Sequence, residues 1–359
     1  MRVLFITRKY PPRIGGMELF SFELYRHLTL DKELVASSQG KAIEILWLAP
    51  WLFFRSWVKA PKFDIIYLAD GVLAPIGWLL KKLTRRPVVA TVHGLELTFK
   101  FPGYQGLIKW SLAKLDKVVC VSENSLKLAK ESGLKPDRLV KIPNGISINT
   151  NRKKVTRQDF SDYLGRETKE AFVMLTIGRQ VKRKGIEWFI REVCPRLSFS
   201  WLYCLVGQGP ETKAINQAIQ ETGAQDSIIQ LGQVSESDKD LLLDTSDCFV
   251  MPNIKVPNDV EGFGLVALEA AGHGLSVLAS RLEGIRDAIH HNKNGLIISP
   301  EKADEWLKEL VNLFNHPNIK KDLGVKAKEY TINNFQWPNI RSAYERVFIR
   351  KTKKNDNEA

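Results

Sequence analysis

The chain has 359 residues, of which 44% are hydrophobic and 26% charged, a composition typical of globular proteins. A chain of this length is too long for one hydrophobic core. We therefore expect two domains rather than one. The formal net charge is +13, and residues 1–148 hold 23 of the 53 Lys and Arg but only 12 of the 40 Asp and Glu. The first half is therefore expected to face an anionic partner.

No uncharged run approaches the ~20 residues that a membrane-spanning helix needs, and the first apolar stretch is too short for a signal peptide. The four cysteines form no C-x-x-C pair, and three lie in apolar runs, so buried reduced thiols are expected. These features predict a cytoplasmic protein whose association with a membrane, if any, is peripheral.

Short apolar runs alternate with amphipathic stretches along the chain, which predicts an α/β protein with parallel sheets. The expected strands of the first half are residues 3–7, 43–48, 63–68, 88–93, 117–121 and 138–142. Those of the second half are residues 172–177, 201–206, 228–232, 248–251, 276–279 and 296–298. Helices are expected at residues 17–28, 122–132, 211–222 and 337–348, with a frayed tail from residue 350.

The domain boundary is expected after Pro143-Asn144-Gly145, because residues 147–157 are polar, basic and aperiodic, as in a linker. We predict two doubly wound Rossmann-like domains, residues 1–146 and 147–336, that face a central cleft at the carboxyl ends of their strands. Residues 337–359 are expected to form a final helix and tail that pack back toward the first domain.

Two motifs in the second half indicate ligand binding. Residues 178–185 read Gly-Arg-Gln-Val-Lys-Arg-Lys-Gly directly after a predicted strand, where open parallel sheets bind ligands. Residues 261–269 read Glu-Gly-Phe-Gly-Leu-Val-Ala-Leu-Glu, which places glycine amides at a helix start that favours anions. The glutamates can accept hydrogen bonds from hydroxyls. Together the motifs predict a pocket for a diphosphate that carries a ribose and a sugar.

These residues also have other interpretations. Basic clusters are most often solvated surface charges, but an ordinary helix cap does not need the two glycines between Glu261 and Glu269. His93 follows a strand, where a purely structural histidine is common. Asp238 and Asp240 form a D-x-D pattern, yet their surroundings predict a helix cap, so no metal is expected.

The order and spacing of these motifs resemble the retaining family 4 glycosyltransferases (group 1) of the GT-B fold, over almost the whole chain. The segments that carry the resemblance are Gly15-Gly16-Met-Glu18, Asn144-Gly145-Ile146, residues 178–185, Val206-Gly-Gln-Gly-Pro210 and residues 261–269. The chain departs from that pattern in being short between residues 30 and 42. It also reads Glu-Gly-Ile-Arg-Asp at 283–287, where the family has a double glycine and then a glutamate.

The resemblance implies roles for individual residues in donor binding and catalysis. Arg179 and Lys184 would hold the diphosphate, Glu269 would accept from the ribose hydroxyls, and Glu261 from those of the donor sugar. His93 would border the reacting sugar, which gives a catalytic set of His93, Glu261, Arg179 and Lys184. The backbone groups expected to meet the sugar and phosphates are those of Gly16, Phe263, Gly264 and Leu265.

The sequence therefore predicts a retaining glycosyltransferase that uses a nucleoside-diphosphate sugar, with a UDP-sugar favoured, and no metal. The expected acceptor is a hydroxyl of a lipid-linked or cell-envelope polysaccharide intermediate. An enzymatic alternative is a sugar-nucleotide epimerase or glycogen-type synthase on the same fold. A basic nucleic-acid-binding protein is the non-enzymatic alternative, although no recognisable nucleic-acid module is present.

An anionic membrane surface is a further expected partner, contacted through the first domain. Aromatic residues beside cations suit the headgroup region of a membrane, although a core helix with a solvated basic end gives the same pattern. The residues concerned are Trp47, Trp51, Phe53, Phe54, Arg55, Trp57, Lys59, Lys81, Lys82, Arg85 and Arg86.

Overall fold

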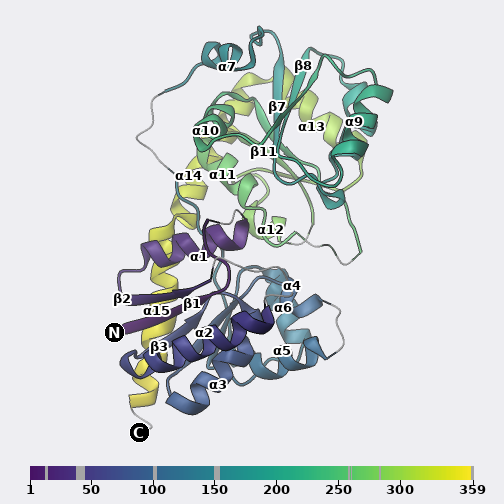
Figure 1. Ribbon diagram of the computed structural model, residues 1–359. Helices are drawn as coiled ribbons and strands as arrows, with labels where there is room; N and C mark the ends of the chain where they lie inside the picture. Colours follow the sequence, from purple (N-terminus) through teal and green to yellow (C-terminus); the bar gives the residue numbers. More distant parts are fainter. Residues whose placement is uncertain are drawn as a thin grey trace. The chain divides into compact units, whose positions relative to one another are not determined.

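The computed structural model describes residues 1–12, 15–37, 45–99, 103–148, 154–257, 259, 261–282 and 284–356, without the side chains of 45–47 and 353–356. The chain forms two compact units. One unit comprises Met1–Gly145 together with Phe335–Ala359, and the other comprises Ile146–Asn334. The first unit is therefore built from both ends of the chain, as the purple and yellow segments of Figure 1 show.

The first unit contains a parallel sheet in the order β2-β1-β3-β4-β5-β6. Its strands are β1 (Arg2–Thr7), β2 (Asp31–Ala36), β3 (Ile65–Leu68), β4 (Val88–Val92), β5 (Lys117–Cys120) and β6 (Leu139–Lys141). The central strands are apolar and buried on both faces, as expected for a parallel sheet covered by helices on each side. Alternate residues therefore serve two different cores.

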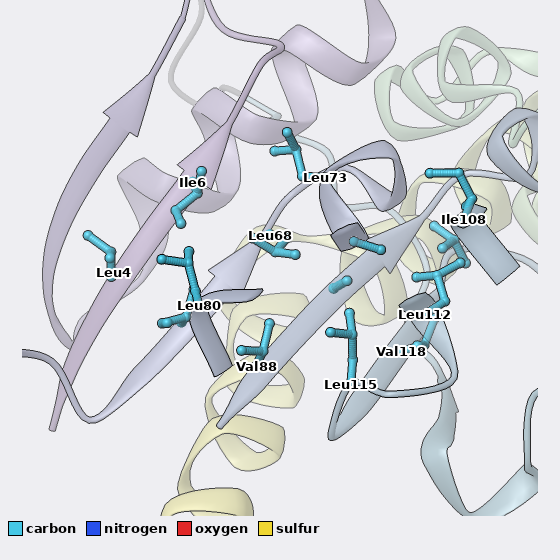
Figure 2. Close-up of a cluster of buried hydrophobic side chains, with 14 of the residues drawn as sticks. Leu4, Ile6, Leu68, Leu73, Leu80, Val88, Ile108, Leu112, Leu115 and Val118 are labelled. Carbon is cyan, nitrogen blue, oxygen red and sulfur yellow. The ribbon is translucent and has the colours of Figure 1, made fainter. Parts of the chain in front are cut away.

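One face of this sheet is covered by α1 (Gly16–His27) and α15 (Trp337–Asp356), which are in contact with each other. The opposite face is covered by helices that share the core of Figure 2, which includes Leu4, Ile6 and Leu68 of the strands and Leu80 and Leu112 of the helices. These helices are α2 (Ile45–Lys59), α3 (Ala74–Thr84), α4 (Leu95–Thr98), α5 (Tyr104–Leu112) and α6 (Glu123–Glu131). Short 3-10 turns lie at Ala60–Lys62, Gly71–Leu73 and Pro136–Arg138.

The second unit contains a parallel sheet in the order β12-β11-β10-β7-β8-β9. Its strands are β7 (Phe172–Ile177), β8 (Trp201–Val206), β9 (Ile228–Gly232), β10 (Cys248–Met251), β11 (Ser276–Ser280) and β12 (Leu296–Ile298). Its helices are α7 (Arg157–Leu164), α8 (Ile186–Glu192), α9 (Thr212–Glu221), α10 (Glu236–Thr245), α11 (Leu265–His273), α12 (Ile285–Ala288), α13 (Ala303–Asn315) and α14 (Pro317–Phe335). Two 3-10 turns, η5 (Lys182–Lys184) and η6 (Cys194–Arg196), complete it.

Each sheet has one topological switch point. In the second unit the chain runs from β7 outward to β8 and β9, then returns to the other side of β7 as β10. The connections that follow β7 and β10 therefore leave toward opposite edges of the sheet. Open α/β sheets bind ligands at the carboxyl ends of two such strands. In the first unit the corresponding position lies between β1 and β3.

Most predicted strands are confirmed within two residues, but the strand expected at 43–48 is wrong. Residues from Ile45 belong to helix α2, and residues 43–44 lie outside the described part. The second strand is instead β2, an edge strand whose sequence Asp-Lys-Glu-Leu-Val-Ala is too polar to resemble a buried strand. The tail expected to fray from residue 350 is helical as far as Asp356.

All four cysteines are free and buried, as predicted, and burial raises the pKa of the Cys204 thiol to about 12. Within the described residues, no helix combines the length and the hydrophobicity that crossing a bilayer requires.

Candidate functional site

The loop after β7 lies at the switch point of the second sheet and carries the first predicted motif. Gly178 follows the strand with φ of 140°, and Gly185 ends the η5 turn with φ of 65°. A Cβ on Gly185 would lie 2.0 Å from the carbonyl oxygen of Pro252, the residue that follows β10. Only glycine therefore allows the β7 loop and the β10 loop to lie against each other here.

Glu261, from the segment after β10, meets the cations of the β7 loop. Its Oε2 lies 2.7 Å from Lys184 Nζ and accepts hydrogen bonds from Arg183 and, at 3.1 Å, from Asn253 Nδ2. Arg183 also pairs with Asp259 at 3.0 Å. The structure thus brings together Lys184 and Glu261, which are far apart in the sequence and were assigned to one pocket from their motifs.

The charge state of Glu261 follows from this environment. Burial alone would raise the pKa of its carboxyl, but Lys184 and Arg183 together lower that pKa to about 2. Glu261 is therefore a carboxylate across the physiological range, able to accept hydrogen bonds from ligand hydroxyls but not to donate a proton.

The two cations predicted to hold a diphosphate have different environments. Lys184 is buried, and its ammonium lies 3.9 Å from the position that a Cβ on Gly178 would occupy. Arg179 is exposed and forms no ion pair with any of the described residues. Lys184 is thus already neutralised by a carboxylate, whereas Arg179 offers an uncompensated guanidinium at the end of β7.

The predicted helix start between the two glutamates is present as α11. Gly264 immediately precedes it with φ of 83°, a conformation that favours glycine, and no side chain of the described residues caps the helix. The amides of Ala267 and Leu268 donate to the Gly264 carbonyl at 3.1 and 3.3 Å, so the earlier amides have no acceptor within the helix. The start of α11, following buried Phe263, is therefore suited to an anion.

Glu269 does not join Glu261 but pairs with a different cation. Lys239 of α10 places its Nζ 3.4 Å from Glu269 Oε2 and 2.7 Å from Glu236 Oε2. Burial raises the pKa of the Glu269 carboxyl, and the Lys239 ammonium opposes that effect. Asp238 in the same segment donates its backbone N–H to the Ser235 side chain, so the predicted helix cap is confirmed.

The first unit holds the other two predicted site residues. Gly16 is the first residue of α1. His93 follows β4, and its Nε2 lies 3.2 Å from the Ala69 carbonyl oxygen, an acceptor that requires this nitrogen to carry the proton. The ring packs edge-on against Phe20 at 4.9 Å. Its orientation is therefore fixed by packing and by one hydrogen bond.

Buried charges surround the backbone of His93. Glu96 accepts the His93 N–H at 3.0 Å and the Gly94 N–H at 2.8 Å. Burial raises the pKa of the Glu96 carboxyl, His93 lowers it, and Asp70 raises it. Asp70 is fully buried and pairs with Arg8 at 2.5 Å, at the switch point between β1 and β3.

Arg183, Asn253 and Lys239 are the polar neighbours of the two glutamates that the sequence analysis did not identify. Arg183 adjoins Lys184 in the sequence and could have been included as a third cation of the loop. Asn253 is buried, donates to Glu261, and leaves its Oδ1 without a partner among the described residues. No pattern in the sequence indicates that Lys239 lies beside Glu269.

The first of the departures from the family pattern, between residues 30 and 42, lies partly outside the described residues. In the second, Glu283 is likewise outside them, but the Gly284 N–H donates to the Glu261 carbonyl at 3.3 Å. In the described part of the chain, no three His, Cys, Asp or Glu side chains are grouped so as to hold a metal ion.

Several known proteins are similar to this chain. N-acetyl-alpha-D-glucosaminyl L-malate synthase of Bacillus anthracis is 25% identical over 79% of the chain and 74% of its own length. The GDP-mannose-dependent alpha-(1-6)-phosphatidylinositol monomannoside mannosyltransferase of Mycolicibacterium smegmatis is 24% identical, covering 93% and 95%. The structure of Anabaena HepE in complex with UDP superposes with a TM-score of 0.80 at 19% identity, covering 98% of this chain and 100% of HepE.

The family comparison covers both units. Residues 3–150 match the family described as Glycosyltransferase Family 4, and residues 160–330 match Glycosyl transferases group 1. The two matched segments contain the loops that carry His93, Lys184 and Glu261. With both sheets doubly wound and both halves matched, the chain belongs to the family 4 (group 1) glycosyltransferases of the GT-B fold.

Proposed function

We propose that this enzyme transfers a sugar from a UDP-sugar to an acceptor hydroxyl, retains the anomeric configuration, and needs no metal. The observation that carries the proposal is the arrangement at the β7–β10 switch point. There, among the described residues, Arg179 has no ion-pair partner, Lys184 and Glu261 form a largely buried pair, and no side chain caps the start of α11. This arrangement suits a diphosphate with hydroxyl groups beside it.

The leaving group of such a reaction is a nucleoside diphosphate, so catalysis requires stabilisation of negative charge as the glycosidic bond breaks. Arg179 contributes a planar set of donors to the phosphate oxygens, and Lys184 contributes a point charge. The free amides at the start of α11 add fixed partial positive charge. These three groups replace the role that a divalent metal has in other glycosyltransferases.

The proposed reaction is a front-face substitution at the anomeric carbon. The bond from this carbon to the departing phosphate oxygen breaks, and the bond to the acceptor oxygen forms on the same face of the sugar. The departing phosphate oxygen takes the proton of the acceptor hydroxyl. No enzyme nucleophile is required, in contrast to a retaining hydrolase with paired carboxylates.

The two glutamates are assigned to hydroxyl groups of the donor. Glu261 is ionised and accepts from the transferred sugar, while Lys184 and Arg183 keep its carboxylate in place. Glu269, held by Lys239, accepts from the ribose. The backbone at Phe263, Gly264 and Leu265 contacts the sugar and phosphates. Gly16 allows close approach of backbone to the phosphates, and His93 contacts the reacting sugar.

The choice of donor and acceptor draws on similar proteins. HepE has been crystallised with UDP and with UDP-glucose, which supports a UDP-sugar as donor. The mycobacterial relative is named for GDP-mannose and for a phosphatidylinositol monomannoside, which supports an acceptor that is lipid-linked. We therefore assign the enzyme to the assembly of a lipid-linked or cell-envelope glycan.

A thermal-shift panel of nucleotide sugars tests the donor, because a ligand that binds only the folded state raises the unfolding temperature. UDP and one UDP-sugar are expected to give the largest shifts, and an Arg179→Ala variant is expected to lose them. Larger shifts with GDP-mannose than with any UDP-sugar would assign the other base. No shift with any nucleotide sugar would contradict the proposed site.

Product analysis tests the chemistry. Incubation with the selected donor and extracted membrane lipids is expected to give an acceptor glycoside with the same anomeric configuration as the donor, by NMR. A chelator is expected to leave the rate unchanged. An isomerised nucleotide sugar without consumption of acceptor would instead identify an epimerase, and an inverted product would exclude the front-face mechanism.

A further inference from the structure

Three helices of the first unit are neighbours on one face of its sheet. Helices α2, α3 and α5 pack against the same side of the sheet, with α3 in contact with both of the others (Figure 1). Their inner residues, including Leu80, Ile108 and Leu112, fill the core of Figure 2. Their outer sides therefore form one continuous surface, to which α5 contributes although the sequence did not indicate it.

This surface exposes large apolar side chains on all three helices. Phe54 is 58% exposed, Val58 72% and Trp110 45%. We call the exposed apolar residues of these helices the aromatic face; they are Trp51, Phe54, Trp57, Val58, Leu83, Leu107 and Trp110. Exposed apolar residues gathered in this way mark an interaction site rather than an ordinary solvated surface.

The exposed rings are held in defined positions. Trp57 stacks on half-buried Phe53 with centroids 6.2 Å apart. Trp110 of α5 meets Trp78 of α3 edge-on at 4.7 Å, which joins the two helices. The rings are thus presented by rigid helices, so insertion into a partner does not require them to be ordered first.

The three helices that carry the aromatic face contain cations and no acidic residues. The sequences of α2, α3 and α5 contain no Asp or Glu but five Lys or Arg. The Arg55 guanidinium lies 5.0 Å from the Trp51 ring centre, and Lys82 Nζ lies 5.7 Å from that of Trp78. Arg55 and Lys82 form no ion pair within the described part of the chain, so their charge is available to an anionic partner.

Some of the cations first assigned to this surface are already paired. Lys59 pairs with Glu33, and Lys81 pairs with Asp116 at 2.9 Å. Arg86 donates to the Pro61 carbonyl at 3.0 Å. The side chain of Trp47 lies outside the described residues. The structure therefore leaves Arg55, Lys82 and Arg85 of the original set, to which Lys109 and Lys114 are added.

We propose that the aromatic face docks on the surface of an anionic lipid bilayer. Tryptophan and phenylalanine rings reside at headgroup level, and neighbouring Lys and Arg are attracted to acidic lipids. A protein partner is less well matched, because protein interfaces are depleted in lysine. The proposal rests on the proposed function in one respect: a lipid-linked acceptor gives the enzyme a reason to reside at the membrane.

Co-sedimentation with vesicles tests the proposal on the full-length protein. Vesicles of equal parts phosphatidylcholine and phosphatidylglycerol are expected to bind it at low salt, and phosphatidylcholine alone to bind far less. Raising the salt should weaken binding. Trp51→Ala/Trp57→Ala is expected to reduce the partition coefficient by about tenfold or more. Lys82→Glu should reduce it by about fivefold or more, on the scale of one cation near an acidic surface.

Matched control variants separate this surface from a general effect of hydrophobicity or charge. Val58→Ser removes an exposed helical valine of the aromatic face, and Val325→Ser removes one from α14 in the second unit, 59% exposed. Lys82→Glu is matched by Lys308→Glu on α13, which makes the same change in net charge. Val58→Ser and Lys82→Glu should weaken vesicle binding, while the two controls should bind like the wild type. Circular dichroism melting confirms that each variant is folded.

Three outcomes would overturn the proposal. The first is failure to bind anionic vesicles at low salt, and the second is an equal loss of binding in the controls. The third is a concentration-dependent dimer, seen by light scattering, that is lost in Trp51→Ala/Trp57→Ala without vesicle binding by the wild type. Vesicle binding is measured without a sugar donor. A lack of vesicle binding can therefore be told apart from a lack of sugar transfer. Sugar transfer to a delipidated acceptor without vesicle binding would remove only the docking surface.

Discussion

Single residues at the β7–β10 switch point carry the proposed catalytic charge. Lys184 is buried against Glu261, whereas Arg179 is exposed and uncompensated among the described residues. A bound diphosphate would therefore gain most from Arg179, and it would share Lys184 with Glu261. Because their environments differ, the contributions of Arg179 and Lys184 to phosphate binding can be tested separately.

Arg179→Ala and Lys184→Ala should each lower the rate of sugar transfer by roughly 10²-fold, the scale of losing one donor to developing charge. Lys182→Ala is the matched control, because Lys182 lies in the same η5 turn but is exposed and forms no ion pair with Glu261. Its rate should stay close to that of the wild type. Steady-state kinetics provide the measurement, and normal turnover in both test variants would remove the diphosphate assignment.

His93→Ala should depress turnover by about tenfold or more while leaving the Kd for UDP unchanged. Glu96 accepts a hydrogen bond from the His93 backbone N–H, and alanine retains this contact. The substitution therefore removes only the imidazole ring and leaves the local backbone in place. Turnover and UDP affinity, the latter by calorimetry, are compared. Equal losses in both would assign His93 a structural role at the end of β4.

The low pKa of Glu261 gives a stability prediction. Its folded-state pKa of about 2 lies below the ordinary value of 4.5, so its ion pairs stabilise the fold at pH values above that ordinary value. This contribution should be lost progressively as the pH falls from about 5 toward 2. The difference in urea midpoint between wild type and Glu261→Gln should therefore shrink between about pH 6 and about pH 3. A difference independent of pH would show that the pKa is not depressed.

The sequence identified some of these residues and not others, for a physical reason. Lys184 and Glu261 occur in motifs at the ends of strands, and parallel strands bring their carboxyl ends to one edge. Glu269 meets Lys239 through the packing of α10 on α11. That contact depends on how two helices are rotated about their axes, which residue spacing within either helix does not specify.

At the scale of elements, the site depends on the contact between the β7 and β10 loops. Gly185→Ala would combine a φ of 65° with a Cβ 2.0 Å from the Pro252 oxygen, so the loops must separate. We expect a loss of roughly 2–4 kcal/mol in the free energy of unfolding, together with weaker UDP binding.

Gly223→Ala is the matched control for this change. Gly223 has φ of 67° in the same unit, but a Cβ there would meet nothing within 4 Å. Only the backbone cost of about 1 kcal/mol is expected, with UDP binding intact. Chemical denaturation and calorimetry compare the two variants, and equal losses of stability would show that the loop contact contributes nothing.

Strand β2 is not predicted from the sequence because it lies at the edge of its sheet. Inner strands such as β7 are buried on both faces and appear in the sequence as nearly continuous apolar runs. An edge strand pairs on one side only and tolerates Asp31, Lys32 and Glu33. The apolar run of α2 was assigned as a strand because short apolar runs do not distinguish a strand from a helix.

At the scale of the whole molecule, the last helix belongs to the core of the first unit. Tyr344 of α15 is fully buried, and its ring packs on Tyr67 at 5.8 Å. Tyr344→Ala should destabilise the first unit by about 3–5 kcal/mol, whereas Tyr344→Phe, which loses only a hydroxyl, should cost about 1 kcal/mol.

Hydrogen exchange with mass spectrometry localises this effect. In Tyr344→Ala, amides of β1, β3 and β4 should exchange faster, while those of β7 and β8 should keep their wild-type protection. Faster exchange confined to the second unit, or no change in either, would contradict the assignment of α15 to the first core.

The division of the first unit between the two ends of the chain has a consequence for its synthesis. A ribosome completes residues 146–334 before it makes any of α15, so the second unit has its whole sequence while the first does not. Until residues 337–348 emerge, the nascent first unit lacks Trp337, Tyr344 and Phe348, and one apolar side of its sheet has only the part of its cover that α1 provides. The half of the enzyme made first is therefore the half that finishes folding last.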